Sequence, residues 1–75
     1  METYTDVNGD SGVAEYETGD DYIRVRFKNG GVYLYTYAQP GQNHVNHMIT
    51  LAIAGDGLNS YINKNVRKLY EAREA

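Results

Sequence analysis

The sequence predicts an α+β domain in which a three-stranded antiparallel sheet is followed by two helices packed on one face of the sheet. Three observations support this class. Residues 22–37 alternate in character around an Asn-Gly pair, apolar residues from Val45 onward recur with helical spacing, and the strand pattern precedes the helix pattern. The chain has 75 residues, which is enough for one small domain with a single thin core.

The predicted sheet begins with a short strand at residues 13–17. The next two strands, residues 22–28 and 32–38, form a hairpin, because Asn29 and Gly30 both tolerate the positive φ that a tight turn requires. Pro40 then ends the sheet, since proline has no N–H to donate to a neighbouring strand.

Two helices are predicted after the sheet. The first has the i, i+3, i+4, i+7, i+8 apolar spacing of an amphipathic helix and ends at Gly55. The second begins near Asn59 or Ser60, either of which is a good N-cap. One stripe of this helix is expected to comprise Ile62, Val66, Leu69, Tyr70 and Arg73. The stripe of the first helix comprises Val45, Met48, Ile49, Ala52 and Ile53.

The hairpin is compatible with two registers, which have different functional consequences. A two-residue loop places Arg26 opposite Tyr33, so that aliphatic residues face the core and the tyrosines lie outside beside the arginines. A three-residue loop, residues 28–30, shifts the pairing by one and turns the tyrosines inward, leaving Val32 and Leu34 outside as a seam for a partner or a second copy. Patterning favours the first register because it buries aliphatic side chains rather than phenols.

The charge distribution is uneven. The net charge is −3, yet residues 1–21 contain seven acidic residues and no Lys or Arg, whereas residues 22–75 carry a net +4. We therefore expect a mobile acidic arm at residues 1–11 and a single folded domain at residues 12–75. The basic residues 22–75 could bind a polyanion, and the acidic arm would then compete with that polyanion for the same surface. The alternative is that the arm only aids solubility.

In the first register, the outer face of the hairpin combines aromatic rings with cations. Single-stranded nucleic acid binds such surfaces because bases stack on rings while Arg and Lys contact phosphates. The second helix adds further positive charge. The candidate ligand-binding residues are Arg24, Arg26, Lys28, Tyr33, Tyr35, Tyr37, Lys64, Arg67 and Lys68.

Catalytic and metal-binding signals are weak. The chain has no cysteine, no phosphate loop and no Ser-His-acid motif, so we expect neither an enzyme nor a resident cofactor. Residues 6–17 partly match the spacing of calcium ligands in an EF-hand, but Ser11 stands where the sharp turn requires glycine. His44 and His47 are three apart, without a third ligand at a suitable spacing, which favours two solvated histidines.

Several motifs in order resemble the KTSC domain, a module named for the C-terminus of some lysyl-tRNA synthetases that also occurs as a stand-alone bacterial protein. They are Phe27-x-Asn29-Gly30, Tyr33-x-Tyr35, Pro40, Tyr61-Ile62-Asn63, Val66-Arg67 and Tyr70. The resemblance covers roughly residues 11–71, although Asn59 and Ile62 replace the glycine and phenylalanine of the family pattern, and residues 55–57 replace its Ala-x-Ser. It implies RNA binding, and the variable middle position of its Tyr-x-Tyr implies inward tyrosines.

Together these observations predict a small non-catalytic module that binds RNA, a nucleotide or another phosphate-bearing ligand. The alternative is a protein-interaction or inhibitor module that self-associates as a homo-oligomer and has structural tyrosines. The N-terminus lacks the basic and apolar regions of a signal peptide, and no apolar run is long enough to span a bilayer. We therefore expect a cytoplasmic protein without a membrane partner.

Overall fold

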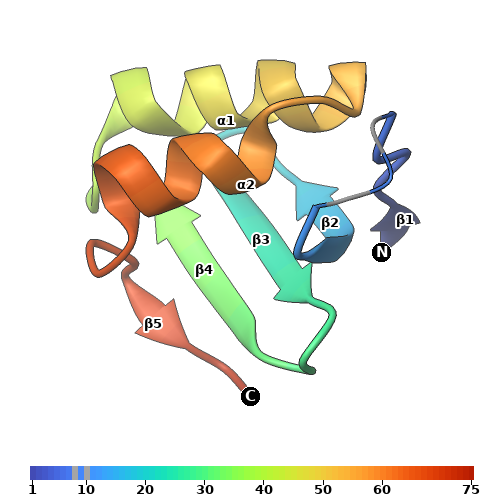
Figure 1. Cartoon of the computed structure of the whole chain (residues 1–75). Coiled ribbons are helices and arrows are strands. Elements are labelled where there is room, and N and C mark those ends of the chain that lie inside the picture. The colour runs from blue at the N-terminus through green and yellow to red at the C-terminus, as the bar shows by residue number, and fades with distance from the viewer. Residues whose placement is uncertain (8, 10) are drawn as a thin grey trace.

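The structure, a computed structural model, describes residues 1–7, 9 and 11–75. It is an α+β fold with an antiparallel sheet and two helices, and the helices lie across one face of the sheet (Figure 1). In the described part of the chain the sheet has five strands in sequential order: β1 (Glu2–Thr3), β2 (Val13–Thr18), β3 (Tyr22–Phe27), β4 (Val32–Thr36) and β5 (Ala72–Arg73). The helices are α1 (Gln42–Ala54) and α2 (Leu58–Tyr61), which continues into a π-helical turn, η1 (Ile62–Val66).

The expected three-stranded sheet is therefore extended by a two-residue strand at each edge. β1 pairs with β2 and β5 pairs with β4, both antiparallel. Two-residue strands are too short to show an alternating pattern in the sequence. The three central strands, in contrast, lie close to their predicted positions.

The hairpin between β3 and β4 adopts the three-residue loop. Ile23 pairs with Tyr35 and Val25 with Tyr33, which is the register that turns these two tyrosines toward the helices. The Phe27 backbone N–H donates to the Gly31 carbonyl at 2.8 Å, and Gly30 has a φ of 95°, as expected of the αL residue in such a loop. The register favoured by binary patterning is thus wrong.

The core lies between the sheet and the helices, and aromatic side chains fill much of it. Tyr35 is 1% exposed, and its burial raises the pKa of its phenol. The tyrosines supply volume that a sheet of aliphatic residues this small would lack. The buried cluster comprises Tyr4, Val13, Tyr16, Ile23, Val25, Tyr35, Val45, Met48, Ala52, Leu58, Ile62 and Val66.

Helix α1 confirms the predicted periodicity and its end. Val45, Met48 and Ala52 are buried, and Gly55 takes the αL conformation that closes the helix. Ile53, expected in the apolar stripe, is 68% exposed, because the helix contacts the narrow sheet through a thinner stripe than predicted.

The second helix differs more from the prediction. It begins at Leu58 after Gly57, and its helical turns end at Val66, so the stripe does not continue to Tyr70 and Arg73. The chain instead turns, with the Leu69 N–H bonded to the Val66 carbonyl, and enters β5. Backbone pairing with β4 has outweighed helical propensity in this segment.

Residues 1–11, predicted as a mobile acidic arm, contribute to the fold where the structure describes them. Glu2 and Thr3 form β1, and Tyr4 is 4% exposed within the core. The Tyr4 hydroxyl accepts a hydrogen bond from the Leu58 N–H at 3.3 Å, and its ring meets Tyr16 edge to face. The segment is thus joined to the core in this structure, and its mobility stays a prediction.

Candidate functional site

The outer face of the sheet, which points away from the helices, carries the predicted arginines together with acidic residues. Arg24 lies opposite Glu17 and Arg26 opposite Glu15 in the pairing of β2 with β3. Because opposite residues on one sheet face are close neighbours, each arginine meets a glutamate. The outer face is therefore charge-balanced.

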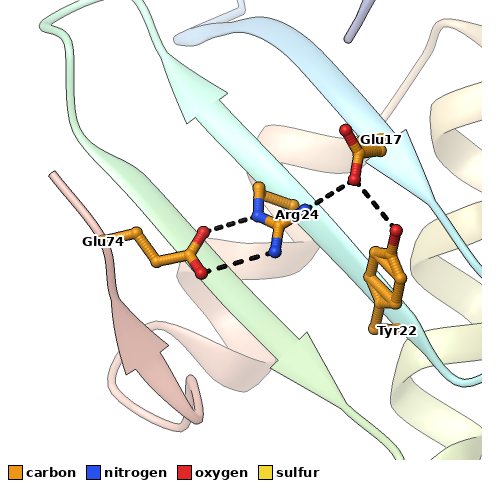
Figure 2. Close-up of polar contacts among 4 residues, drawn as sticks. All are labelled: Glu17, Tyr22, Arg24 and Glu74. Carbon is orange, nitrogen blue, oxygen red and sulfur yellow. Dashed lines mark hydrogen bonds and ion pairs between the residues drawn. The ribbon is translucent and has the colours of Figure 1, made fainter.

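Arg24 is the centre of a polar network that joins β3 to β2 and to Glu74, the residue after β5 (Figure 2). Its Nη1 donates to Glu17, while its Nε and Nη2 donate to the two carboxylate oxygens of Glu74 at 2.5 and 3.4 Å. The Glu74 hydrogen bond raises the pKa of Arg24. The Tyr22 hydroxyl also donates to Glu17, and this bond raises the pKa of Tyr22. All three donor nitrogens of Arg24 are thus engaged within the chain.

The other two predicted cations of the hairpin are also paired. Arg26 forms an ion pair with Glu15 at 3.3 Å, and Lys28 forms one with Asp6 at 3.2 Å. The sequence predicts a positive face here, but the cations of β3 and its turn are paired with acidic residues from the N-terminal part of the chain. Asp6, Glu15 and Glu17 thus neutralise the positive charge of the hairpin.

The predicted tyrosines lie on the helix side of the sheet or at its end. Tyr35 is buried, whereas Tyr33 and Tyr37 are half-buried against the core. The Tyr37 hydroxyl donates to Asn46 Oδ1 on α1 at 2.7 Å, which fixes that ring away from Tyr33 and Tyr35. The outward tyrosine–arginine surface predicted from the sequence is therefore wrong.

A cleft of about 330 Å³ opens between the hairpin turn, η1 and the segment that follows η1. We call it the tyrosine cleft. Its lining combines aromatic rings, two side-chain amides and two cations. The lining residues are Phe27, Asn29, Tyr33, Tyr35, Ile62, Asn63, Arg67, Lys68 and Tyr70.

The aromatic rings of the tyrosine cleft form a continuous cluster. Tyr33 and Tyr70 are stacked, with ring centroids 4.9 Å apart and planes 16° from parallel. Phe27 contacts Tyr33 at 5.5 Å, and Tyr35 meets Tyr70 edge to face. The guanidinium of Arg73 lies 5.4 Å from the centroid of the Tyr33 ring. The cluster offers polarisable ring surface beside positive charge.

Arg67 and Lys68 are exposed at the rim of the tyrosine cleft. Neither makes an ion pair with any residue that the structure describes, in contrast to the cations of β3. A cation without a partner carboxylate is available to an anionic ligand, whereas a paired one must first lose its partner. Two accessible cations thus lie at this cleft, while Lys64, also exposed and without an ion pair among the described residues, lies outside it.

The structure brings together four of the nine predicted binding residues and separates the rest. Five of them lie outside the tyrosine cleft: Arg24 and Arg26 on the outer face, Lys28 in the turn, Tyr37 and Lys64. The four that line it are Tyr33, Tyr35, Arg67 and Lys68. Sequence reasoning missed the amides of Asn29 and Asn63 and placed Phe27, Ile62 and Tyr70 in the core or its edge. Tyr70 and Asn63 belong to the motifs that resemble the KTSC pattern. That resemblance was the one sequence signal that could have pointed to these two residues.

A second, smaller pocket of about 200 Å³ lies near the N-terminal segment and is lined by Asp6, Asp56 and other polar residues. The expected calcium ligands fall partly here, but Asn8 and Asp10 lie outside the described residues. Asp6 is bound to Lys28 and to the Ser11 N–H, and Glu17 to Arg24. Among the described residues, no group of three His, Cys, Asp or Glu side chains is placed to hold a metal.

The histidine pair packs around a tyrosine. His44 Nδ1 lies 2.7 Å from the Tyr61 hydroxyl, and the His47 ring stacks on Tyr61 at 4.5 Å. The pair therefore joins α1 to α2, whereas the sequence favoured two solvated side chains. His47 is exposed and His44 half-buried.

Comparison with protein-family models, curated proteins and solved structures gives no match. The resemblance to the KTSC domain therefore stays a prediction. No helix in the described part of the chain has the length and apolar character needed to cross a membrane.

Proposed function

We propose that this chain is a small, non-catalytic binding module that takes up single-stranded RNA, or another ligand combining an aromatic ring with phosphate, in the tyrosine cleft. The observation that carries the proposal is the meeting of stacked aromatic rings with two cations that lack ion-pair partners among the described residues. Bases stack on the faces of aromatic rings, and Arg and Lys donate hydrogen bonds to phosphate oxygens.

The amides at the rim suit the same ligand class. Asn29 and Asn63 line the tyrosine cleft on opposite sides, one from the hairpin turn and one from η1. A side-chain amide donates and accepts hydrogen bonds at once, as the edge of a base does. Asn29 already accepts a hydrogen bond from the Gly31 N–H through Oδ1, which orients its amide nitrogen as the remaining donor group.

The test is binding of a fluorescently labelled ten-nucleotide oligouridine, followed by fluorescence anisotropy at several salt concentrations. Lys68→Ala removes a cation from the tyrosine cleft, and Lys64→Ala is its control, because both lysines are exposed and follow α2 but only Lys68 lines the cleft. If Lys68 neutralises one phosphate, its loss makes the negative slope of log affinity against log salt shallower by about 0.7, whereas Lys64→Ala leaves this slope unchanged. Equal effects of the two variants would contradict a site at the cleft.

The stacking contribution is tested separately with Tyr33→Leu, which keeps an apolar side chain against Phe27 and Tyr70. We expect the variant to lose about 1–3 kcal/mol of binding free energy, the usual effect of removing one base–aromatic stack. A variant with unchanged affinity would show that the ring of Tyr33 does not contact the ligand.

A self-associating interaction module is the alternative function. Its predicted seam included Val32, but this residue is only 5% exposed, because the backbone of residues 74–75 pairs with it along the β4 edge. Leu34 remains partly accessible, and Ile53 is exposed elsewhere on the molecule. Sedimentation velocity over a range of protein concentrations tests this alternative: a dimer that persists at high salt would favour it over ligand binding.

A further inference from the structure

The C-terminal segment, residues 69–75, passes along the edge of β4 and contacts both faces of the sheet. Arg73 pairs with Tyr33, whose side chain faces the helices, so its own side chain lies on that side, as the guanidinium over the Tyr33 ring shows. Glu74 follows on the opposite side and reaches Arg24 (Figure 2). One short segment thus contacts a ring of the tyrosine cleft and an arginine of the outer face.

On the helix side, Tyr70 occupies stacking surface of Tyr33. The near-parallel rings at 4.9 Å have the offset arrangement that an aromatic ring of any ligand would adopt on a tyrosine. The edge-to-face contact with Tyr35 holds Tyr70 in this position. A base that stacks on this face of Tyr33 must therefore take the place of Tyr70.

On the outer side, Glu74 occupies the Nε–Nη2 edge of Arg24, the edge of a guanidinium that also binds phosphates. Its two carboxylate oxygens accept from Nε and Nη2 of Arg24, while Glu17 takes only Nη1. The Nε–Nη2 edge is a planar fork that binds carboxylate and phosphate with the same two-bond geometry. Departure of Glu74 would leave this fork open even with Glu17 still bound.

We propose that the C-terminal segment is an internal substitute for the ligand, with Tyr70 in the place of a base and the Glu74 carboxylate in the place of a phosphate, so that the segment and the ligand compete. This inference rests on the proposed function, because Tyr33 lines the tyrosine cleft, and it adds Arg24 on the outer face to the surface that the ligand contacts. Binding with the segment in place is weak, and release of the segment exposes Tyr33 and the fork of Arg24 together.

The segment is held in a way that permits release. Its backbone bonds to β4 include those from the Glu71 N–H to the Leu34 carbonyl and from the Glu74 N–H to the Val32 carbonyl, both 2.7 Å. None of the residues in the buried cluster comes from residues 69–75. Tyr70 packs against the cluster from outside, and residues 74–75 cover Val32. Detachment therefore uncovers Tyr35 and Val32 but removes no member of the cluster, as expected of an element that opens locally.

The first test compares two variants that each remove one negative charge from the outer face. Glu74→Gln weakens the hold of the segment on Arg24, whereas Glu15→Gln removes the partner of Arg26 and leaves the segment untouched. We expect Glu74→Gln to bind the ten-nucleotide oligouridine about tenfold more tightly than wild type, and Glu15→Gln to stay within about twofold. Equal affinities for the two variants would overturn the proposal, since only general electrostatics would then be at work.

The second test locks the segment in place. Leu34 and Ala72 are paired across β4 and β5, and Cα atoms of antiparallel partners lie within the range that a disulfide spans. The double variant Leu34→Cys with Ala72→Cys has no other cysteine to interfere, and circular dichroism verifies its fold in both redox states. We expect the oxidised form to bind about tenfold more weakly than the reduced form.

The outcomes separate the two proposals. If oxidised and reduced forms bind equally while wild type binds, the cleft accepts ligand with the segment in place and the competition is refuted, although the proposed function stands. If no form binds at low salt, including the reduced double variant and Glu74→Gln, the proposed function fails and the competition fails with it.

Discussion

Replacing Tyr4 by alanine tests whether the N-terminal segment belongs to the folded core. The side chain is 4% exposed, its ring packs against Tyr16, and its hydroxyl accepts from the Leu58 N–H at the start of α2. Truncating a buried aromatic residue to alanine costs about 3–5 kcal/mol. A 75-residue domain has a stability of about 4–11 kcal/mol, so this one change removes a large share of it.

The hydroxyl contribution can be separated from that of the ring. Tyr4→Phe keeps the packing but leaves the Leu58 N–H without its acceptor, which costs about 1–3 kcal/mol for a buried donor. Tyr37→Phe is the matched control, since its hydroxyl bonds to Asn46 at an exposed position where water can take its place. We therefore expect Tyr37→Phe to cost less than about 1 kcal/mol.

Urea unfolding followed by circular dichroism measures all three variants, with the slope of unfolding free energy against urea as an internal check on two-state behaviour. If Tyr4→Ala costs less than about 1 kcal/mol, the reasoning is refuted. The first residues would then be detached in solution, as the acidic composition of the arm predicts.

Two further predictions concern stability. Desolvation opposes ionisation of Asp6, but hydrogen bonds from Lys28 and the Ser11 N–H outweigh it and lower the pKa of Asp6. Wild type should therefore be more stable than Asp6→Asn above the ordinary aspartate pKa of 3.8, and this difference in stability should disappear as the pH falls through the lowered pKa of the folded state. The urea midpoints of the two proteins should converge between neutral pH and pH 2, and a constant gap would contradict the assignment. Gly55→Ala places a Cβ 2.6 Å from Thr5 Cβ at a φ of 74°, whereas the Cβ of Gly30→Ala, at a φ of 95°, meets no atom within 4 Å. Both variants carry backbone strain, so thermal unfolding should show a clearly larger loss of stability for Gly55→Ala. Equal losses of stability would mean that Thr5 moves aside at no cost.

The parts of the fold that the sequence predicts are those with a long, regular signal. Helix α1 follows from the spacing of Val45, Met48 and Ala52 and from the left-handed Gly55 at its end. The hairpin follows from Asn29 and Gly30. The register does not, because these two residues suit both a two-residue and a three-residue loop, and only the fold shows that Tyr35 rather than Leu34 is buried under the helices.

The candidate site was harder to predict because its parts come together only through the fold. Tyr70 appeared to continue a helical stripe, yet the chain leaves the helix after Val66 and brings its ring to Tyr33. The pairing of Glu15 and Glu17 with the arginines was visible in the alternation of residues 13–17, since acids and bases on neighbouring antiparallel strands face each other. Taken strand by strand, the sequence therefore suggests more free positive charge on the hairpin than the paired sheet has.

The π-helical turn η1 makes the tyrosine cleft sensitive to the length of the chain as well as to its side chains. A π-turn encloses one more residue per hydrogen bond than an α-helical turn, and each residue of an α-helix advances the direction of the following side chains by about 100°. In η1, Ile62 and Val66 are buried, while Asn63 and Arg67 are exposed and line the cleft. Deletion of a single residue, such as Asn65, would restore regular winding and rotate the cations away from the rings without altering any residue that lines the cleft. The length of η1 is thus as much a determinant of the shape of this cleft as the side chains that line it.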